Sequence, residues 1–280
     1  MSRPPVTGST RLAGVIGSPV RHSLSPAIHN AGFDECGLDW VYVALEVLPG
    51  SAAAALEGMR AFGIAGLSVT MPHKDAVHDL VDERSLAAER MRAVNCVQLV
   101  DGRLIGHNTD GDGFVDSLRL DAGVDPSGLS VVVLGAGGAA RSVIEALARA
   151  GAAGIAVVNR TEARAVEAAS LGGKAGRSGT LADIARADLV VNATSVGLGT
   201  EQLPIGGDHL RPGQLVADLV YHPLDTALLR AARSAGARAL DGLGMLVHQA
   251  GRQFELWTGT PAPVEAMRAA AEAELERRRS

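Results

Sequence analysis

The sequence predicts an α/β protein of two domains, the second built on a doubly wound parallel sheet. Three observations predict this class. Short apolar runs alternate with helical patterns along most of the 280 residues. Glycine is abundant, with 34 residues, and it clusters where apolar runs end, which is typical of tight turns between strands and helices. A glycine-rich turn also follows the apolar run 130–134 and opens a helical pattern.

Strands and helices alternate in the first half. Runs rich in β-forming residues predict strands at 11–17, 40–47 and 66–70. An Asp-Gly pair between apolar runs predicts a β-hairpin over 94–106. Helices are predicted at 25–37, 51–63 and 85–93. Ser25 is expected to cap the first of these and Pro26 suits its first turn, whereas Ser51 and Gly63 bound the second.

The second half continues the alternation. The strand 130–134 leads into a helix that reaches about residue 150, and the strand-like runs 155–161, 213–221 and 237–242 are separated by helices at 161–171 and 225–235 and by the segment 181–195. This order predicts a parallel sheet with right-handed crossovers. The stretch 244–259 is apolar at helical spacing, and 261–280 is a polar helix rich in Ala, Glu and Arg.

Composition excludes several classes of protein. The formal charge of −5 gives no general attraction to nucleic acid or to anionic membranes. Cys36 and Cys96 lie far apart, which excludes a disulfide framework and a cysteine zinc site and fits a reducing compartment. The N-terminal segment MSRPPVTGST has no apolar signal region, and no apolar run is long enough for a membrane span. We therefore expect a cytoplasmic protein.

The glycine-rich turn predicts a dinucleotide site. Residues 135–140 read G-A-G-G-A-A, which fits the G-x-G-x-x-A pattern between a buried strand and a helix. Gly135 permits the tight turn, Gly137 lets the backbone approach a pyrophosphate, and the helix N-terminus offers amide donors to phosphate. The alternative is a strand–helix turn without a ligand. The expected cofactor-contacting residues of this turn are Gly135, Ala136, Gly137, Gly138 and Ala139.

The end of the next strand favours NADP over NAD. An NAD site usually has a carboxylate about 20 residues after the glycine turn, where it binds the ribose. This chain instead has Asn159, Arg160 and Thr161, followed by Arg164. Arginine can bind a 2′-phosphate through two hydrogen bonds. The alternative is that both arginines pair with surface acids, and the nearby Glu162 weakens the case for NADP.

Three motifs in the first half are candidates for a substrate site. Ser23 and Ser25 lie before a helix, where two hydroxyls can hold a carboxylate. Lys74 follows a strand and a proline in a predicted loop, and Asp110 lies at the junction of the two halves. Taken alone, each has an ordinary explanation: a capped helix, a solvated lysine and a turn.

Together these motifs resemble the shikimate dehydrogenase family over about residues 12–259. The resemblance is carried by the segments 17–19, 22–26, 29–30, 69–74, 93–95, 106–110, 135–141, 159–161, 192–195, 218–221 and 241–246, and by Gln249.

The resemblance implies a substrate-binding domain at 1–109, completed by the helices of 246–280, and a Rossmann-type NADP domain at 110–245. It implies reversible reduction of 3-dehydroshikimate to shikimate with NADPH, in aromatic amino acid biosynthesis. Lys74 and Asp110 match the catalytic pair. The implied substrate-binding residues are Ser23, Ser25, Thr70, Asn95, Tyr221 and Gln249, and Asp110 also matches a residue that holds ring hydroxyls. Further implied cofactor contacts are Thr194, Leu219, Gly242 and Met245.

One residue departs from the family pattern. Ser68 stands where the family often has asparagine, and its shorter side chain leaves open which polar contact is made there. Two alternatives remain open: a quinate/shikimate dehydrogenase that prefers NAD, and a non-catalytic NADP-binding regulatory relative. We expect a small-molecule substrate, no nucleic acid or membrane partner, and a monomer or homodimer.

Overall fold

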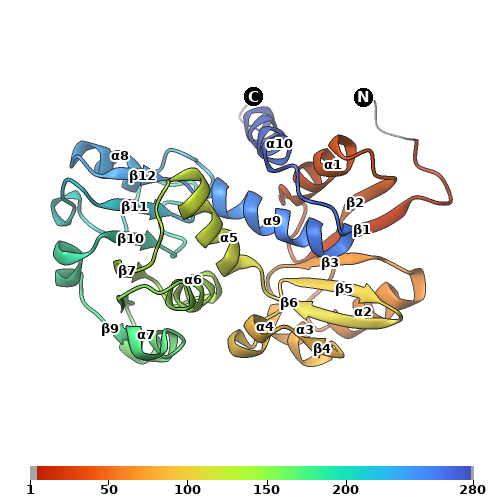
Figure 1. Ribbon diagram of the computed structural model, residues 1–280, viewed down its shortest axis with the longest axis horizontal. Coiled ribbons are helices and arrows are strands. Elements are labelled where there is room, and N and C mark those ends of the chain that lie inside the picture. The colour runs from red at the N-terminus through yellow and green to blue at the C-terminus, as the bar shows by residue number, and fades with distance from the viewer. Residues whose placement is uncertain (1–4, 279–280) are drawn as a thin grey trace. The chain divides into compact units, whose positions relative to one another are not determined.

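The computed structural model describes residues 5–278, which form two compact units. Unit 1 comprises the described residues up to Thr109 and those from Gln249 onward, and unit 2 runs from Asp110 to His248. In Figure 1, strands β1–β6 of unit 1 run from red to yellow, and strands β7–β12 of unit 2 run from green to blue. The first four residues of the N-terminal segment and the last two of the predicted helix 261–280 lie outside the described residues.

Unit 1 contains a six-stranded mixed sheet in the order β2-β1-β3-β5-β6-β4. β1 pairs in parallel with β2 and β3, whereas β5 runs antiparallel to both β3 and β6. The predicted hairpin is confirmed: Asp101 and Gly102 join β5 to β6 with φ of +49° and +78°, the positive values that a type I′ turn requires. The strands are β1 Arg11–Gly17, β2 Trp40–Glu46, β3 Gly66–Val69, β4 Glu83–Arg84, β5 Cys96–Val100 and β6 Arg103–His107.

The helices of unit 1 confirm most of the sequence prediction. They are α1 Ser25–Glu35, α2 Ala52–Phe62, α3 Lys74–Leu80, α4 Leu86–Met91, the second part of α9 Leu243–Thr258, and α10 Val264–Arg277. The prediction of a loop around Lys74 is wrong, because Lys74 is the first residue of α3. α2 packs its buried Leu56 and Met59 against apolar residues of the sheet such as Ile16.

The prediction that Ser25 caps α1 is also wrong. Ser25 lies inside the helix and the N-cap position is Leu24, which offers no side-chain acceptor. The hydroxyl that helps the first turn is Ser23 Oγ, which accepts a hydrogen bond from the Ser25 amide at 3.2 Å. The prediction for Pro26 is confirmed, since it stands in the first turn.

Unit 2 contains a six-stranded sheet in which every paired neighbour is parallel. Its order, β12-β11-β10-β7-β8-β9, is that of a doubly wound Rossmann-type sheet, and the strand order reverses between β7 and β10. This confirms the predicted fold class. The strands are β7 Ser130–Leu134, β8 Gly154–Val158, β9 Gly176–Ser178, β10 Leu189–Asn192, β11 Leu215–Asp218 and β12 Arg238–Leu240.

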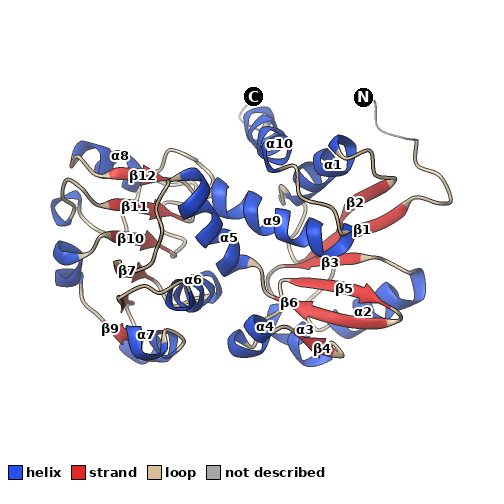
Figure 2. Cartoon of the chain, in the orientation of Figure 1, coloured by secondary structure: helices blue, strands red, loops and turns tan. Residues whose placement is uncertain are grey.

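Both faces of this sheet are buried, which explains why its strands are continuously apolar. Val131 and Val133 belong to one core with residues of α5, α6 and α7, whereas Val132 and Leu134 belong to a second core with residues of α8. Figure 2 shows how these helices alternate with the strands. The helices of unit 2 are α5 Asp110–Asp116, α6 Gly138–Arg149, α7 Glu162–Ser170, α8 Ala227–Ser234, the first part of α9, the π-helical turn Ser117–Asp121, and the 3₁₀ turns Gly173–Ala175, Leu181–Arg186 and Gly207–His209.

Within residues 5–278, no helix combines the length and the apolar character that a membrane crossing would need.

Candidate active site

The glycine turn of unit 2 lies where β7 ends and α6 begins. Gly135 has φ of +106°, a conformation that favours glycine, and its amide donates to the Val158 carbonyl at 2.8 Å. A Cβ at this position would lie 3.0 Å from the Ala193 carbonyl oxygen and 3.1 Å from Thr194 Cγ2. The turn therefore stands beside the carboxyl end of β10, at the point where the strand order reverses and ligands of such sheets bind.

The outer side of this turn is open. Gly137, Gly138 and Ala139 are exposed, and a Cβ placed on Gly137 or Gly138 would meet no atom within 4 Å. Gly137 is the N-cap of α6, a 12-residue helix whose first amides have no partner within the helix. Such an end binds anions through its amide donors and its helix dipole. Ala136 is half-buried against the unit 2 core.

The end of β8 presents the arginines expected to contact a 2′-phosphate. Arg160, Thr161 and Arg164 are exposed, and Asn159 is half-buried with its Nδ2 donating to the Thr161 carbonyl at 3.0 Å. Neither Arg160 nor Arg164 forms an ion pair with any described residue. The alternative that they serve only to pair with surface acids thus finds no support. A phosphate would meet two guanidinium groups here without displacing a carboxylate.

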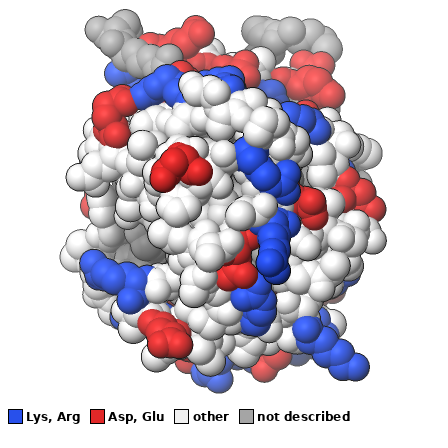
Figure 3. Space-filling model, turned by 90° about the vertical axis from the view of Figure 1, so that its left-hand side faces the viewer, with Lys and Arg blue, Asp and Glu red and all other residues white. Residues whose placement is uncertain are grey.

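Several other arginines of unit 2 are paired with acids. Arg177 pairs with Asp183 at 2.5 Å and Arg119 pairs with Asp125 at 2.9 Å. The face drawn in Figure 3 shows Lys and Arg side chains interspersed with Asp and Glu. By comparison, Arg160 and Arg164 are exposed and form no ion pair with a described residue.

A polar cluster holds the loop after β10, which lies beside Gly135 of the glycine turn. Thr194 Oγ1 donates to Asn192 Oδ1 at 2.7 Å, and Asn192 Nδ2 donates to Asp218 Oδ1 at 2.8 Å. Asp218 also accepts from Thr226 Oγ1 at 2.7 Å. Burial raises the pKa of Asp218, and hydrogen bonds from Thr226, the Val220 amide and Asn192 offset part of that rise. The cluster fixes the loop after β10, and hence Thr194, relative to β11.

The remaining expected residues of unit 2 follow β11 and β12. Leu219 and Tyr221 are half-buried, and Met245 packs against the unit 2 core. A Cβ on Gly242 would come within 2.4 Å of the Leu219 carbonyl oxygen, so only glycine allows the chain to pass there. Asp110 is the buried first residue of α5. α5 packs closely on α6, since a Cβ on Gly111 would lie 2.4 Å from the Ser142 carbonyl oxygen.

In unit 1, the structure brings the two expected carboxylate-binding serines together. Ser23 Oγ lies 3.1 Å from Ser25 Oγ; Ser23 is half-buried and Ser25 is buried. Thr70 follows β3, and its amide donates to the Ile16 carbonyl at 2.9 Å. A Cβ on Gly17 would collide with Thr70 Cγ2 at 2.4 Å, so this glycine gives Thr70 its place beside β1.

The structure also brings Asn95 and Gln249 together, although 154 positions separate them. Both are buried, and Asn95 Nδ2 lies 3.5 Å from Gln249 Oε1. Thr109 joins them: its amide donates to Asn95 Oδ1 at 2.8 Å and its hydroxyl donates to the Gln249 carbonyl at 3.2 Å. These hydrogen bonds anchor the chain immediately before Asp110.

Lys74 is half-buried at the start of α3. Its carbonyl accepts from the Val94 amide at 3.0 Å, which places the backbone of Lys74 beside the residue that precedes Asn95. Lys74 belongs to unit 1 and Asp110 to unit 2, and each is fixed within its own unit.

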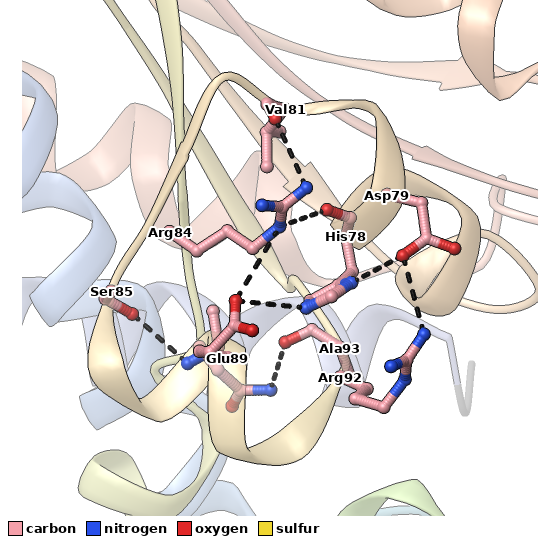
Figure 4. Close-up of polar contacts among 10 residues, drawn as sticks. His78, Asp79, Val81, Arg84, Ser85, Glu89, Arg92 and Ala93 are labelled. Atoms are coloured by element: carbon pink, nitrogen blue, oxygen red, sulfur yellow. Dashed lines mark hydrogen bonds and ion pairs between the residues drawn. The ribbon is translucent and has the colours of Figure 1, made fainter.

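Polar contacts hold α3 one turn after Lys74 (Figure 4). The buried His78 has its Nδ1 2.8 Å from Asp79 Oδ1 and its Nε2 3.6 Å from Glu89 Oε2 of α4. Arg84 Nε donates to the His78 carbonyl at 2.5 Å. The hydrogen bond from His78 is the main cause of the lowered pKa of Asp79. These contacts fix the helix that carries Lys74.

Sequence reasoning missed a further group of polar residues behind Asn95 and Gln249, namely Tyr42 and Gln253. The signal was present for Gln253, because it lies four residues after Gln249 and so shares its helix face. Within the described part of the chain, no group of three or more His, Cys, Asp or Glu residues is arranged to hold a metal ion.

Comparison with known proteins defines the family. The chain matches the models of the shikimate dehydrogenase substrate binding domain over residues 15–97, of shikimate / quinate 5-dehydrogenase over 121–198, and of the shikimate 5'-dehydrogenase C-terminal domain over 242–272. The chain belongs to the shikimate dehydrogenase family.

Particular relatives are similar over nearly their whole length. The shikimate dehydrogenase (NADP(+)) of Moorella thermoacetica is 46% identical over 94% of this chain and 92% of its own. A crystal structure of a shikimate dehydrogenase in complex with NADP+ has a TM-score of 0.91 and 36% identity, covering 97% of this chain and 98% of that one. The shikimate 5-dehydrogenase of Thermus thermophilus in complex with NADP(H) and shikimate has a TM-score of 0.89 and 37% identity, covering 94% and 99%.

Proposed function

We propose that this protein is an NADP-dependent oxidoreductase that reversibly reduces 3-dehydroshikimate to shikimate in aromatic amino acid biosynthesis. The observation that carries the proposal is the match to a relative named shikimate dehydrogenase (NADP(+)) at 46% identity over 94% of the chain. The chain combines that match with the open glycine turn in unit 2 and the Asn95–Gln249 cluster in unit 1.

NADP(H) is held by unit 2. The amides at the start of α6 bind the pyrophosphate, and the Arg160 and Arg164 guanidinium groups bind the 2′-phosphate. Thr194, Leu219, Gly242 and Met245 line the nicotinamide end. When bound, the reduced cofactor supplies the hydride that a ketone reduction requires.

Unit 1 holds the substrate. The Ser23 and Ser25 hydroxyls bind its carboxylate, and Thr70, Asn95 and Gln249 hold ring hydroxyls. Tyr221 of unit 2 adds a further contact. All of these groups are neutral donors or acceptors, which suits a small polyhydroxylated acid that must bind and leave in each turnover.

Lys74 supplies the proton. Its ammonium hydrogen-bonds the carbonyl oxygen, stabilises the negative charge that develops there, and donates a proton to it. Asp110 orients Lys74 and accepts a hydroxyl of the ring. The chain holds two lysines, Lys74 and Lys174, among its 26 Lys and Arg residues. Arginine cannot give up a proton in a protein, so lysine is the basic residue that this task needs.

The activity assay follows NADPH absorbance with 3-dehydroshikimate, repeated with NADH and, in the reverse direction, with quinate. We expect turnover with NADPH and a lower kcat/KM with NADH. Lys74→Ala is expected to lower kcat by about 10²–10⁴-fold with a smaller change in KM. Lys74→Arg is expected to remain impaired although it keeps the charge, whereas Lys174→Ala, at an exposed position, serves as the matched control.

A Lys74→Ala enzyme with wild-type kcat would refute the role of Lys74. Absence of NADPH oxidation by the wild-type enzyme would refute the function and favour the regulatory alternative. A preference for NADH over NADPH in the reduction, together with oxidation of quinate by NAD+, would instead identify the NAD-dependent alternative.

The cellular location and the oligomeric state are part of the same proposal. The free thiols Cys36 and Cys96 and an NADPH-consuming reaction fit a cytoplasmic enzyme. We expect it to act as a monomer or homodimer on a small molecule alone, and light scattering after size-exclusion chromatography measures which of the two forms is present.

A further inference from the structure

A chain of hydrogen bonds crosses the interior of unit 1 and ends at Gln249. The Tyr42 hydroxyl on β2 donates to Ser68 Oγ on β3 at 2.6 Å, and Ser68 Oγ donates to Gln253 Oε1 on α9 at 2.5 Å. Gln253 Nε2 then donates to Gln249 Oε1 at 2.8 Å. Tyr42, Ser68 and Gln253, here called the donor chain, are all buried.

The direction of these hydrogen bonds follows from the chemistry of the groups. Burial raises the pKa of Tyr42, so its hydroxyl keeps its proton and remains a donor. Ser68 has one hydroxyl proton; because its oxygen accepts from Tyr42, the proton can be directed to Gln253. Gln253 Oε1 is engaged by Ser68, so the Nε2 of the same amide points the other way. Nε2 lies within hydrogen-bond distance of three acceptors, namely Gln249 Oε1, Thr109 Oγ1 at 3.2 Å and the Asn95 carbonyl at 3.4 Å.

The start of the donor chain is rigid. The Tyr42 amide donates to Asn30 Oδ1 and the Tyr42 carbonyl accepts from Asn30 Nδ2, both at 2.9 Å. Its ring stacks on His29 with centroids 4.4 Å apart and planes 9° apart. Ser68 is equally constrained, because β3 pairs with β1 on one side and β5 on the other.

The end of the donor chain controls an amide expected to contact substrate. Gln249 Oε1 accepts from Gln253 Nε2 at 2.8 Å and from Asn95 Nδ2 at 3.5 Å. An amide has one oxygen and one NH₂ group, so engaging the oxygen inside the cluster makes Nε2 the donor that Gln249 presents to a ligand. A donor in this position requires an oxygen acceptor on the ring. Sites built in this way discriminate strongly against analogues that lack the matching hydroxyl.

We propose that Tyr42, Ser68 and Gln253 are positioning residues that fix the amide orientation of Gln249 and thereby determine the hydroxyl pattern the substrate site accepts. The inference rests on the proposed function, in which Gln249 holds a ring hydroxyl. It also assigns a role to Ser68, the residue that departs from the family pattern. The Ser68 hydroxyl joins Tyr42 to Gln253 by accepting from one and donating to the other.

The test measures binding and turnover in Ser68→Ala, Gln253→Leu and Tyr42→Phe. Shikimate affinity is measured by calorimetry on the full chain without cofactor, and KM and kcat are measured for 3-dehydroshikimate. We expect Gln253→Leu to weaken shikimate binding about tenfold or more, with Ser68→Ala weaker in effect and Tyr42→Phe weakest, as the distance from Gln249 grows. KM for NADPH is expected to stay unchanged. Thr258→Ala, which removes a hydroxyl bonded to the Phe254 carbonyl at 2.8 Å on the same helix, is the matched control.

The double variant separates positioning from general stability. If Ser68 acts through Gln253, Ser68→Ala adds little to the loss of shikimate affinity already caused by Gln253→Leu. Additive losses in the double variant, or Gln253→Leu and Ser68→Ala proteins that each bind shikimate within twofold of wild type, would overturn the inference. If Ser68→Ala does not fold, Tyr42→Phe tests the same chain of hydrogen bonds, because it removes the hydroxyl that donates to Ser68. A wild-type protein that neither binds shikimate nor turns over 3-dehydroshikimate would instead refute the proposed function itself.

Discussion

His29 should make unit 1 sensitive to acid. Its imidazole is fully buried, stacked on Tyr42 at 4.4 Å and lying 5.1 Å from the Trp257 ring. Neither ring nitrogen has a hydrogen-bond partner among the described residues. Burial therefore lowers the pKa of His29 from 6.5 to about 3, because a charged imidazolium would lose its hydration without gaining a partner.

The magnitude follows from linkage between protonation and unfolding. The unfolded chain binds a proton at His29 below about pH 6.5, whereas the folded chain does not until about pH 3. The contribution of His29 to the free energy of unfolding is therefore fully present above its unfolded pKa of about 6.5. It is lost as the pH falls below that value, by about 1.4 kcal/mol for each pH unit. Lowering the pH from 6.5 to 5 should cost about 2 kcal/mol through this residue alone.

The variant His29→Leu removes the titrating group and loses no hydrogen bond. Urea unfolding at several pH values between 8 and 5 is followed by tryptophan fluorescence. The chain has two tryptophans, Trp40 and Trp257, and both are buried in unit 1, so the signal reports the unit that holds His29. We expect the free energy of unfolding of the variant to depend on pH less steeply than that of wild type, by about 2 kcal/mol over the acidic range.

The comparison cancels the other acid-sensitive groups. His107, whose pKa burial also lowers, is present in both proteins and contributes equally to each. His22→Leu, at an exposed position, should leave the wild-type pH dependence in place. Parallel pH profiles for wild type and His29→Leu would show that the buried imidazole carries a proton in the folded state, and would refute the reasoning.

Two further predictions concern unit 2. The double variant Arg160→Gln/Arg164→Gln should raise KM for NADPH about tenfold or more and leave KM for NADH unchanged, because only NADPH carries the 2′-phosphate. Equal effects on KM for both cofactors would contradict the assignment. Gly242→Ala should destabilise the protein by about 1–3 kcal/mol in thermal unfolding, because its Cβ would lie 2.4 Å from a backbone oxygen. Gly154→Ala, where a Cβ meets no atom within 4 Å, is the control and should melt like wild type.

The fold was largely predictable because its local patterns and its packing agree. The strand 130–134 is continuously apolar, and the structure buries alternate residues against two different cores. The Asp-Gly pair fixes a hairpin through backbone conformations that few other dipeptides adopt. α3 and α5 were missed because both are short and each begins at a residue, Lys74 or Asp110, that was considered only as a candidate for chemistry.

Helix ends were less predictable than helix positions. Ser25 stands where a capping residue belongs, yet the helix begins at Ser25 itself and Ser23 provides the acceptor. A single Ser-x-Ser sequence allows either arrangement, and the choice depends on how the preceding loop leaves β1. Local propensity does not determine that path.

The substrate side shows a deeper limit of sequence reasoning. Asn95 and Gln249 are 154 positions apart, and Ser68 and Gln253 are 185 apart, so no local pattern connects them. They meet because β3 lies at the centre of the unit 1 sheet and α9 returns to pack beside it. The resemblance to a family could suggest which residues are expected to contact the ligand, since these form recurring motifs.

The residues behind them follow a different rule. A buried polar group is tolerated only when its neighbours satisfy it, so the identity of Ser68 is tied to Tyr42 and Gln253 rather than to its own motif. An asparagine at position 68 would bring a longer side chain and one more donor hydrogen than serine into a site where Gln253 already supplies an amide. Ser68 is therefore best understood as one part of a three-residue arrangement, in which its hydroxyl on β3 joins Tyr42 on β2 to Gln253 on α9.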